Sequence, residues 1–206
     1  FFKRHSAILI LCFILLFKIG DNMAGAMTIP FILKMGFSKA EYFVIVKGIG
    51  MFGLFGGVIL GGSIMIRLGI ARSLWVFGIL QSVSTAFFAV MVIMDHTSPA
   101  WLDYRQVILG CIVGFEFFAT GLGQAAYATY MAIQTNKRFT ATQYALLTSL
   151  MAVPGVVAAS ATGYMAKYLG WDMFYYLCAL IAIPGLLLLF KIAPWNASNE
   201  DLEEGR

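Results

Sequence analysis

The strongest constraint on the fold of this chain is a succession of six apolar stretches, each about 20 residues or longer, separated by short polar breaks. A helix needs about 20 apolar residues to cross a bilayer, and only a helix or a closed barrel satisfies every backbone polar group there. We therefore predict an all-α membrane protein with six transmembrane helices. The predicted spans are approximately 7–33, 41–66, 73–94, 106–134, 140–167 and 171–191.

The composition leaves little room for a water-soluble domain. Of the 206 residues, 61% are hydrophobic and 12% are charged, about half the charged fraction of an ordinary soluble domain. The net charge of +4 comes from basic residues paired at helix ends and not aligned along one face, so nucleic acid is not an expected partner. We expect one bundle over residues 1–195 and an acidic tail over residues 196–206.

The start of the chain has some features of a secretory signal peptide, because a basic segment precedes an apolar run over residues 7–17. Lys18 and Asp21 interrupt that pattern, and apolar residues resume over 23–33. We therefore favour a spanning helix. Since the chain starts with Phe1 and not with methionine, we also expect the bundle to be half of a longer protein.

The positions of Lys and Arg predict the orientation in the membrane. On one side of the predicted membrane lie Lys3, Arg4, Arg67, Arg72, Lys137, Arg138, Lys191 and Arg206. On the other side lie Lys34, Lys39, Arg105 and Lys167. Cytoplasmic loops retain positive charge during insertion, whereas Asp and Glu have little influence. The asymmetry of eight to four therefore predicts that both ends of the chain are cytoplasmic.

Two ionisable residues stand near the middle of the first span. At 1.5 Å per residue, Lys18 and Asp21 lie about 16 to 20 Å along a span of about 40 Å, and they share a helix face with Gly25 and Thr28. A mid-membrane charge costs several kcal/mol unless it is paired or hydrated. We interpret the two as an ion pair facing a cavity, where Lys18 binds substrate and Asp21 takes part in proton coupling. A purely structural pair is the alternative.

A third ionisable residue, Glu116, lies about 15 Å into the fourth span. Its helix face continues through Thr120, Gly123, Gln124, Tyr127, Tyr130 and Gln134. A lone carboxylate at that depth requires water, a proton or a cation, so we predict a cavity with Glu116 as its protonatable group. Hydroxyl, amide and aromatic groups suit an amphiphilic solute, which makes Thr120, Gln124 and Tyr127 candidate substrate contacts. The alternative is that the stripe lines a helix interface.

Two further polar residues in the spans are harder to interpret. Gln81 is a candidate substrate contact, but together with Ser84 and Thr85 it could equally hold helices together. Lys47 lies about 9 Å from the outer end of its span, so its long stem is able to reach the membrane surface.

Small residues recur at helical spacing in the second and fourth spans. Gly53, Gly57 and Gly61 line one side of the second span, and Gly110 and Gly114 repeat the pattern in the fourth. Helices in lipid associate by close backbone approach at such residues. The pattern fits a static packing seam and a mobile gate equally well.

The sequence gives no support for an enzyme. It contains no paired catalytic carboxylates, no metal-ligand cluster and no nucleophile with a base at motif spacing, and His5 and His96 lie on opposite sides of the predicted membrane. Cys12, Cys111 and Cys178 each fall inside an apolar run, so we expect buried thiols and neither disulfides nor zinc. We expect no cofactor.

The connection between the second and third spans, over residues 62–72, resembles the cytoplasmic gating motif of the major facilitator superfamily. Ile66 stands where that motif has an acidic residue, while its basic turn is retained. The resemblance implies a cytoplasmic gate formed by Gly62, Arg67, Gly69 and Arg72.

A more specific resemblance covers nearly the whole chain. Segments similar to the AmpG-type muropeptide permeases are Phe17-Lys18-Ile19-Gly20-Asp21, Phe77-Gly78-Ile79-Leu80-Gln81, Phe115-Glu116 with Gly121 and Gly123, and Ala141-Thr142-Gln143-Tyr144-Ala145-Leu146-Leu147. The resemblance is to the C-terminal six helices of that family. It implies proton-driven import of anhydro-muropeptides, the sugar-peptide fragments of cell-wall turnover, from periplasm to cytoplasm across the bacterial inner membrane.

These observations lead to one prediction with two alternatives. We predict half of a twelve-helix transporter of the major facilitator superfamily, which would work with protons, a sugar-peptide solute and a complementary N-terminal half. The first alternative is a permease for a siderophore or another bulky amphiphile, since siderophore permeases have similar sequences. The second is a non-transporting membrane scaffold or receptor.

Overall fold

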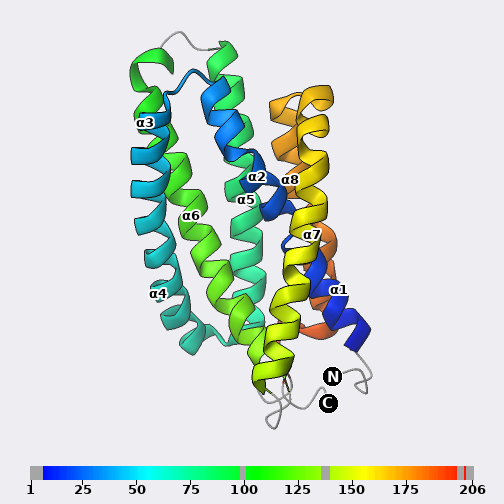
Figure 1. Cartoon of the computed structure of the whole chain (residues 1–206). Coiled ribbons are helices and arrows are strands. Elements are labelled where there is room, and N and C mark those ends of the chain that lie inside the picture. The colour runs from blue at the N-terminus through cyan, green and yellow to red at the C-terminus, as the bar shows by residue number, and fades with distance from the viewer. Residues whose placement is uncertain (1–6, 98–100, 136–139, 199–201, 203–206) are drawn as a thin grey trace.

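The computed structural model describes residues 7–97, 101–135, 140–198 and 202, and every regular element in these ranges is helical. The elements are α1 (Ala7–Phe17), α2 (Ile19–Lys34), α3 (Lys39–Tyr42), the π-helical η1 (Phe43–Ile49), α4 (Gly50–Leu68), α5 (Ile70–Thr97), α6 (Trp101–Ile133), α7 (Thr140–Leu169) and α8 (Trp171–Ile192). They form six stretches long and apolar enough to cross a membrane (Figure 1). The prediction of an all-α protein with six transmembrane helices is confirmed.

The first span differs from the prediction, because it is two helices and not one. The α-helix is interrupted at Lys18, and α2 begins at Ile19. Both sides of the interruption press closely on α8: a Cβ on Gly20 would collide with the carbonyl of Cys178, and a Cβ on Gly185 would lie 2.9 Å from Cα of Phe17. The interruption therefore lies where the first span packs tightly against α8, and it places Lys18 mid-span.

The second span begins with a capping box that was not predicted from the sequence. The Ser38 hydroxyl accepts from the backbone amide of Glu41, and the Glu41 carboxylate accepts from the backbone amide of Ser38. This pairing satisfies two backbone donors that have no partner within the helix. The π-helical η1 follows after α3, and the helix then continues as α4 to Leu68. Such π segments are rare and frequently mark functional sites.

The glycines of α4 form a packing seam against α6. A Cβ on Gly53 would lie 2.7 Å from the carbonyl oxygen of Gly114, and a Cβ on Gly57 would collide with the carbonyl of Phe118. From the other side, a Cβ on Gly121 would collide with the carbonyl of Leu54. The two backbones therefore touch, as small residues permit between helices in lipid. The glycines therefore form a close packing seam in this structure, which a static seam and a mobile gate would share.

The remaining helices pack around this pair. The α6 helix lies between α4 and α5, α8 packs against α5 and both parts of the first span, and α7 packs mainly against α2 (Figure 1). Large apolar side chains on α4 and α7 face outward, including Phe52 at 82% exposure and Val157 at 65%. Only 12% of the most apolar 18-residue stretch of α7 is buried. The side of the bundle formed by α7 is thus covered by few other residues of this chain.

The start of α1 and the end of α8 lie at the same end of the bundle as the turn between α4 and α5 (Figure 1). Arg67, Arg72 and Lys191 belong to helix ends on this side. Lys34, Lys39, Arg105 and Lys167 belong to helix ends on the opposite side. The predicted basic residues at 3, 4, 137, 138 and 206 lie outside the described residues, as does most of the predicted tail.

Candidate functional site

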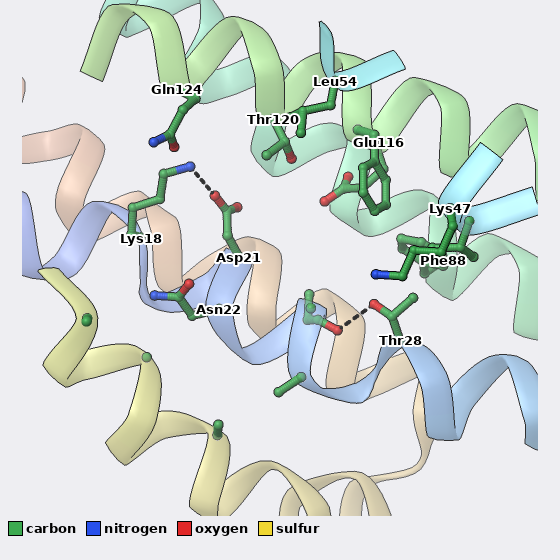
Figure 2. Close-up of a pocket in the computed structure, with 18 of the residues that line it drawn as sticks. Lys18, Asp21, Asn22, Thr28, Lys47, Leu54, Phe88, Glu116, Thr120 and Gln124 are labelled. Carbon is green, nitrogen blue, oxygen red and sulfur yellow. Dashed lines mark hydrogen bonds and ion pairs between the residues drawn. The ribbon is translucent and has the colours of Figure 1, made fainter. Parts of the chain in front are cut away.

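A cavity of about 770 Å³ lies between α2, η1, α4, α6 and α7. Lys18, Asp21, Asn22 and Gln124 occupy one part of it, while Thr28, Lys47 and Phe88 occupy another (Figure 2). Glu116 and Thr120 lie along the α6 wall. Small residues of α7, Ala152, Gly155 and Ala159, form the wall opposite. A mostly apolar cavity with a few charged and polar side chains is the usual form of a ligand site.

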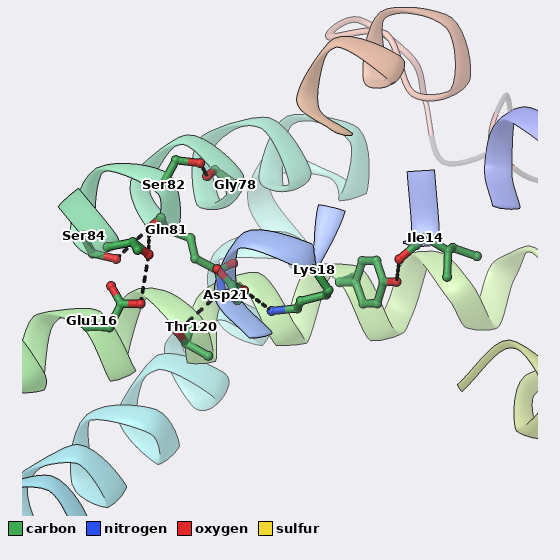
Figure 3. A network of polar contacts seen from close by, with 11 residues as sticks. Ile14, Lys18, Asp21, Gly78, Gln81, Ser82, Ser84, Glu116 and Thr120 are labelled. Carbon is green, nitrogen blue, oxygen red and sulfur yellow. Dashed lines mark hydrogen bonds and ion pairs between the residues drawn. The ribbon is translucent and has the colours of Figure 1, made fainter. Parts of the chain in front are cut away.

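The predicted ion pair is formed at the interruption of the first span. The Lys18 ammonium donates to Oδ2 of Asp21 at 2.8 Å, with 7% and 17% of the two side chains exposed. The side-chain amide of Gln81 donates to the same carboxylate oxygen (Figure 3). Because the Lys18 and Asp21 side chains also line the cavity, the pair is available to a bound solute.

Glu116 lines the cavity but is almost completely buried, at 8% exposure. Its Oε1 lies 3.0 Å from the Thr85 hydroxyl (Figure 3). Its Oε2 has no hydrogen-bond partner among the residues that the structure describes. A buried carboxylate oxygen without a partner is costly, so Glu116 needs a proton, a water molecule or a ligand. This is the environment that its depth in the fourth span predicted.

The structure separates the predicted substrate contacts into two groups. Thr120 and Gln124 line the cavity. Gln81 is 2% exposed and lies behind the wall, where its amide contacts Asp21 and, at 3.5 Å, the Thr120 hydroxyl.

Tyr127 is not brought to the cavity. It is fully buried, its hydroxyl donates to the carbonyl of Ile14 at 2.7 Å, and its ring stacks on Phe17 with centroids 5.4 Å apart. The α1 segment covers this part of α6, so the polar stripe enters a helix interface after Gln124 in the sequence. The stripe therefore lines the cavity at Glu116, Thr120 and Gln124, and it lies in a helix interface at Tyr127.

Two cavity residues were missed or left open by sequence reasoning. Asn22 follows Asp21 directly and lies against α7, where a Cβ on Gly155 would come within 2.8 Å of its amide nitrogen. Lys47 lines the cavity from η1. No carboxylate in the described ranges lies within ion-pair distance of Lys47. An uncharged polar residue beside a mid-membrane ion pair was the available signal for Asn22; the π turn that orients Lys47 has no clear sequence signal.

The four predicted gate residues surround the turn between α4 and α5. Gly69 makes this turn at φ +80°, a conformation that glycine adopts without strain. Arg72 donates to the carbonyl of Trp195 at 3.3 Å, which ties the turn to the segment after α8. Arg67 is exposed, and a Cβ on Gly62 would meet nothing within 4 Å. The four residues therefore share one end of the bundle without forming one cluster.

The described residues contain no group of three or more His, Cys, Asp or Glu side chains that could hold a metal ion. The polar groups of the cavity are instead suited to hydrogen bonds and to ionic contacts with an organic solute.

Comparison with known proteins identifies the family. No protein-family model matches the chain. A Haemophilus influenzae protein without an assigned function is 36% identical over 207 residues, which cover 97% of this chain and 47% of that protein. The anhydromuropeptide permease of Escherichia coli strain K12 is 36% identical over 190 residues, which cover 92% of this chain and 37% of the permease. A Rickettsia conorii protein with the transporter name AmpG 4 is 33% identical over 192 residues, covering 93% and 44%.

This chain thus spans somewhat less than half the length of the relatives that it matches. The similarity covers more than nine-tenths of the chain, which holds the six spans and the cavity between them. The chain therefore belongs to the family of AmpG-type permeases and is a multi-pass membrane protein.

Proposed function

We propose that this chain is the C-terminal six-helix half of a major facilitator superfamily transporter that imports anhydro-muropeptides across the bacterial inner membrane. The proposal has one main support, the cavity at the interrupted first span with its charged and polar side chains. Its volume of about 770 Å³ lies in the upper part of the range for ligand pockets and suits a bulky solute. The names of the relatives add the class of solute.

The second half of the transporter would complete the cavity. The relatives are more than twice as long as the matched segment, and the outward apolar faces of α4 and α7 flank the cavity. Transporters of this architecture bind solute between two repeats near the bilayer midplane. We use the term assembled transporter for this chain together with the six-helix half that completes it.

Different residues of the cavity bind the solute and the proton. The Lys18 ammonium offers a charge partner to a carboxylate of the solute, and Asp21 holds that ammonium when the site is empty. Thr120 and Gln124 exchange hydrogen bonds with hydroxyl and amide groups of the sugar. Tyr127 supports the α6 wall from behind by anchoring it to α1.

Glu116 is the proposed site of proton coupling, with Asp21 as its electrostatic neighbour. When Glu116 is protonated, it is a neutral group that the helices can enclose. When it is ionised, its unpartnered oxygen requires water and favours a state that is open to one side. An inward proton gradient would drive import, and in the predicted orientation the turn between α4 and α5 faces the cytoplasm.

Uptake by the assembled transporter in proteoliposomes tests this proposal. Labelled anhydro-muropeptide should accumulate above its equilibrium level when an inward proton gradient is imposed, and a protonophore should abolish the accumulation. Accumulation that resists the protonophore would contradict proton coupling. Uptake of a ferric siderophore in place of the muropeptide would favour the alternative permease. Failure to move or bind either solute would favour the scaffold.

A further inference from the structure

One residue behind the cavity wall contacts Asp21 directly and is linked to Glu116 through the Thr85 hydroxyl. We propose that Gln81 is a positioning residue, which holds Asp21 in its ion pair with Lys18 and connects that pair to the protonation state of Glu116 through one turn of α5. This inference rests on the proposed transport function and assigns to Gln81 a structural link between solute binding and proton uptake.

The side chain of Gln81 holds the ion pair from one side. Its amide donates to Oδ2 of Asp21, the same atom that accepts from the Lys18 ammonium (Figure 3). The contact joins α5 to the first turn of α2, immediately after the interruption at Lys18. A hydrogen bond to a charged group is stronger than one between neutral groups, so this contact restrains the start of α2.

The α6 helix leaves space for this side chain at one position. A Cβ on Gly123 would collide with Oε1 of Gln81 and lie 3.3 Å from its Cδ. The donating nitrogen itself lies 3.9 Å from that Cβ, so a larger residue would act on the contact with Asp21 by pushing the oxygen side of the rigid amide group. A substitution at Gly123 therefore disturbs this contact without changing the Gln81 side chain itself.

The backbone of Gln81 is connected to Glu116. The carbonyl of Gln81 lies 3.1 Å from the Thr85 hydroxyl and 2.9 Å from the Ser84 hydroxyl. The Thr85 hydroxyl also lies 3.0 Å from Oε1 of Glu116. Thr85 has one hydroxyl hydrogen for two acceptors, so it can donate to only one of them at a time.

The protonation of Glu116 decides which acceptor Thr85 serves. An ionised Glu116 takes the Thr85 hydrogen, which leaves the Gln81 carbonyl with the Ser84 hydroxyl, itself a neighbour of Glu116. A protonated Glu116 donates to the Thr85 oxygen, and Thr85 is then free to donate to the Gln81 carbonyl. The hydrogen bonds of Gln81 thus depend on both groups of the site. Its backbone carbonyl is affected by the protonation of Glu116, and its side-chain amide is bound to Asp21.

Other ionisable groups also face Glu116. Lys18 and Asp21 act on it electrostatically from the first span, Tyr175 and Cys178 face it from α8, and Lys47 lies across the cavity on η1. Assigning a pH response of the site to Glu116 therefore requires a variant that changes only this group, and Glu116→Gln is such a variant.

Hydrogen exchange in the assembled transporter tests the inference without reference to any solute. The measured segment covers residues 18–24, whose first turn includes the bond from the Asn22 amide to the Lys18 carbonyl. Gln81→Leu should raise the exchange rate there about tenfold, since a charge-assisted contact is lost. Gly123→Ala should have the same effect by displacing the amide. Gly163→Ala is the matched control, because its added Cβ meets nothing within 4 Å.

A double-mutant cycle with Glu116→Gln tests the connection. The effect of Gln81→Leu on exchange should differ at least about threefold between the Glu116 and Glu116→Gln backgrounds. Equal effects in both backgrounds would overturn the connection to Glu116. Unchanged exchange in both Gln81→Leu and Gly123→Ala would overturn the positioning role. Should Gln81→Leu fail to fold, Gly123→Ala alone decides. Failed muropeptide uptake by the wild-type protein would refute the proposed function but leave these exchange results interpretable.

Discussion

Replacing Gly57 by alanine is expected to destabilise the bundle, because the added methyl group has no space in the seam between α4 and α6. It would collide with the carbonyl of Phe118 and lie 3.0 Å from both Cα of Gly121 and the amide nitrogen of Leu122. All three are backbone atoms, so no side-chain rotation relieves the contact. Overpacking of this kind costs about 1 to 3 kcal/mol.

The neighbouring Gly56→Ala variant is a matched control for Gly57→Ala. The two substitutions change helix propensity equally, but a Cβ on Gly56 lies 3.9 Å from its nearest neighbour, the Phe118 ring. Thermal unfolding of the purified protein should therefore show a melting temperature roughly 2 to 12 °C lower for Gly57→Ala than for Gly56→Ala. Equal melting temperatures would refute the tight seam.

Three further predictions concern transport, orientation and the gate. Glu116→Gln should retain solute exchange but lose uphill uptake driven by a proton gradient; wild-type uphill uptake by this variant would exclude the coupling role. In a background without Cys12, Cys111 and Cys178, a cysteine at exposed Ala40 should react with an impermeant thiol reagent from the periplasm, and one at exposed Leu68 should not; the reverse pattern would invert the proposed orientation. Arg72→Gln should slow transport and increase proteolysis after α8, since the contact to the Trp195 carbonyl is lost, while a change in topology would instead assign Arg72 to insertion alone.

Much of the fold could be predicted from the sequence because burial in lipid imposes a simple length rule. Each span needs a continuous apolar stretch, and the six stretches appear directly in the residues. The interruption at Lys18 could not be predicted this way. It lies where Gly20 and Phe17 press against α8, which is a contact between segments more than 150 residues apart in sequence.

The candidate site was predictable where a residue type is costly in lipid. Lys18, Asp21 and Glu116 stood out because a mid-membrane charge requires a partner or a cavity, and the structure places all three at the same cavity. Helical periodicity extended the stripe too far, since it cannot show that α1 covers Tyr127. The capping box of Ser38 and Glu41 was readable from its spacing but was missed.

The most direct test of a substrate site at the interrupted first span is equilibrium binding of anhydro-muropeptide to the assembled transporter. Lys18→Met removes the cation that we assign to a carboxylate of the solute and leaves Asp21 without its ion-pair partner. Lys34→Met is the matched control, because Lys34 is exposed at the end of α2. We predict that Lys18→Met weakens binding at least about tenfold while Lys34→Met has no effect. Equal affinities of the wild-type and Lys18→Met proteins would contradict a substrate site at this ion pair.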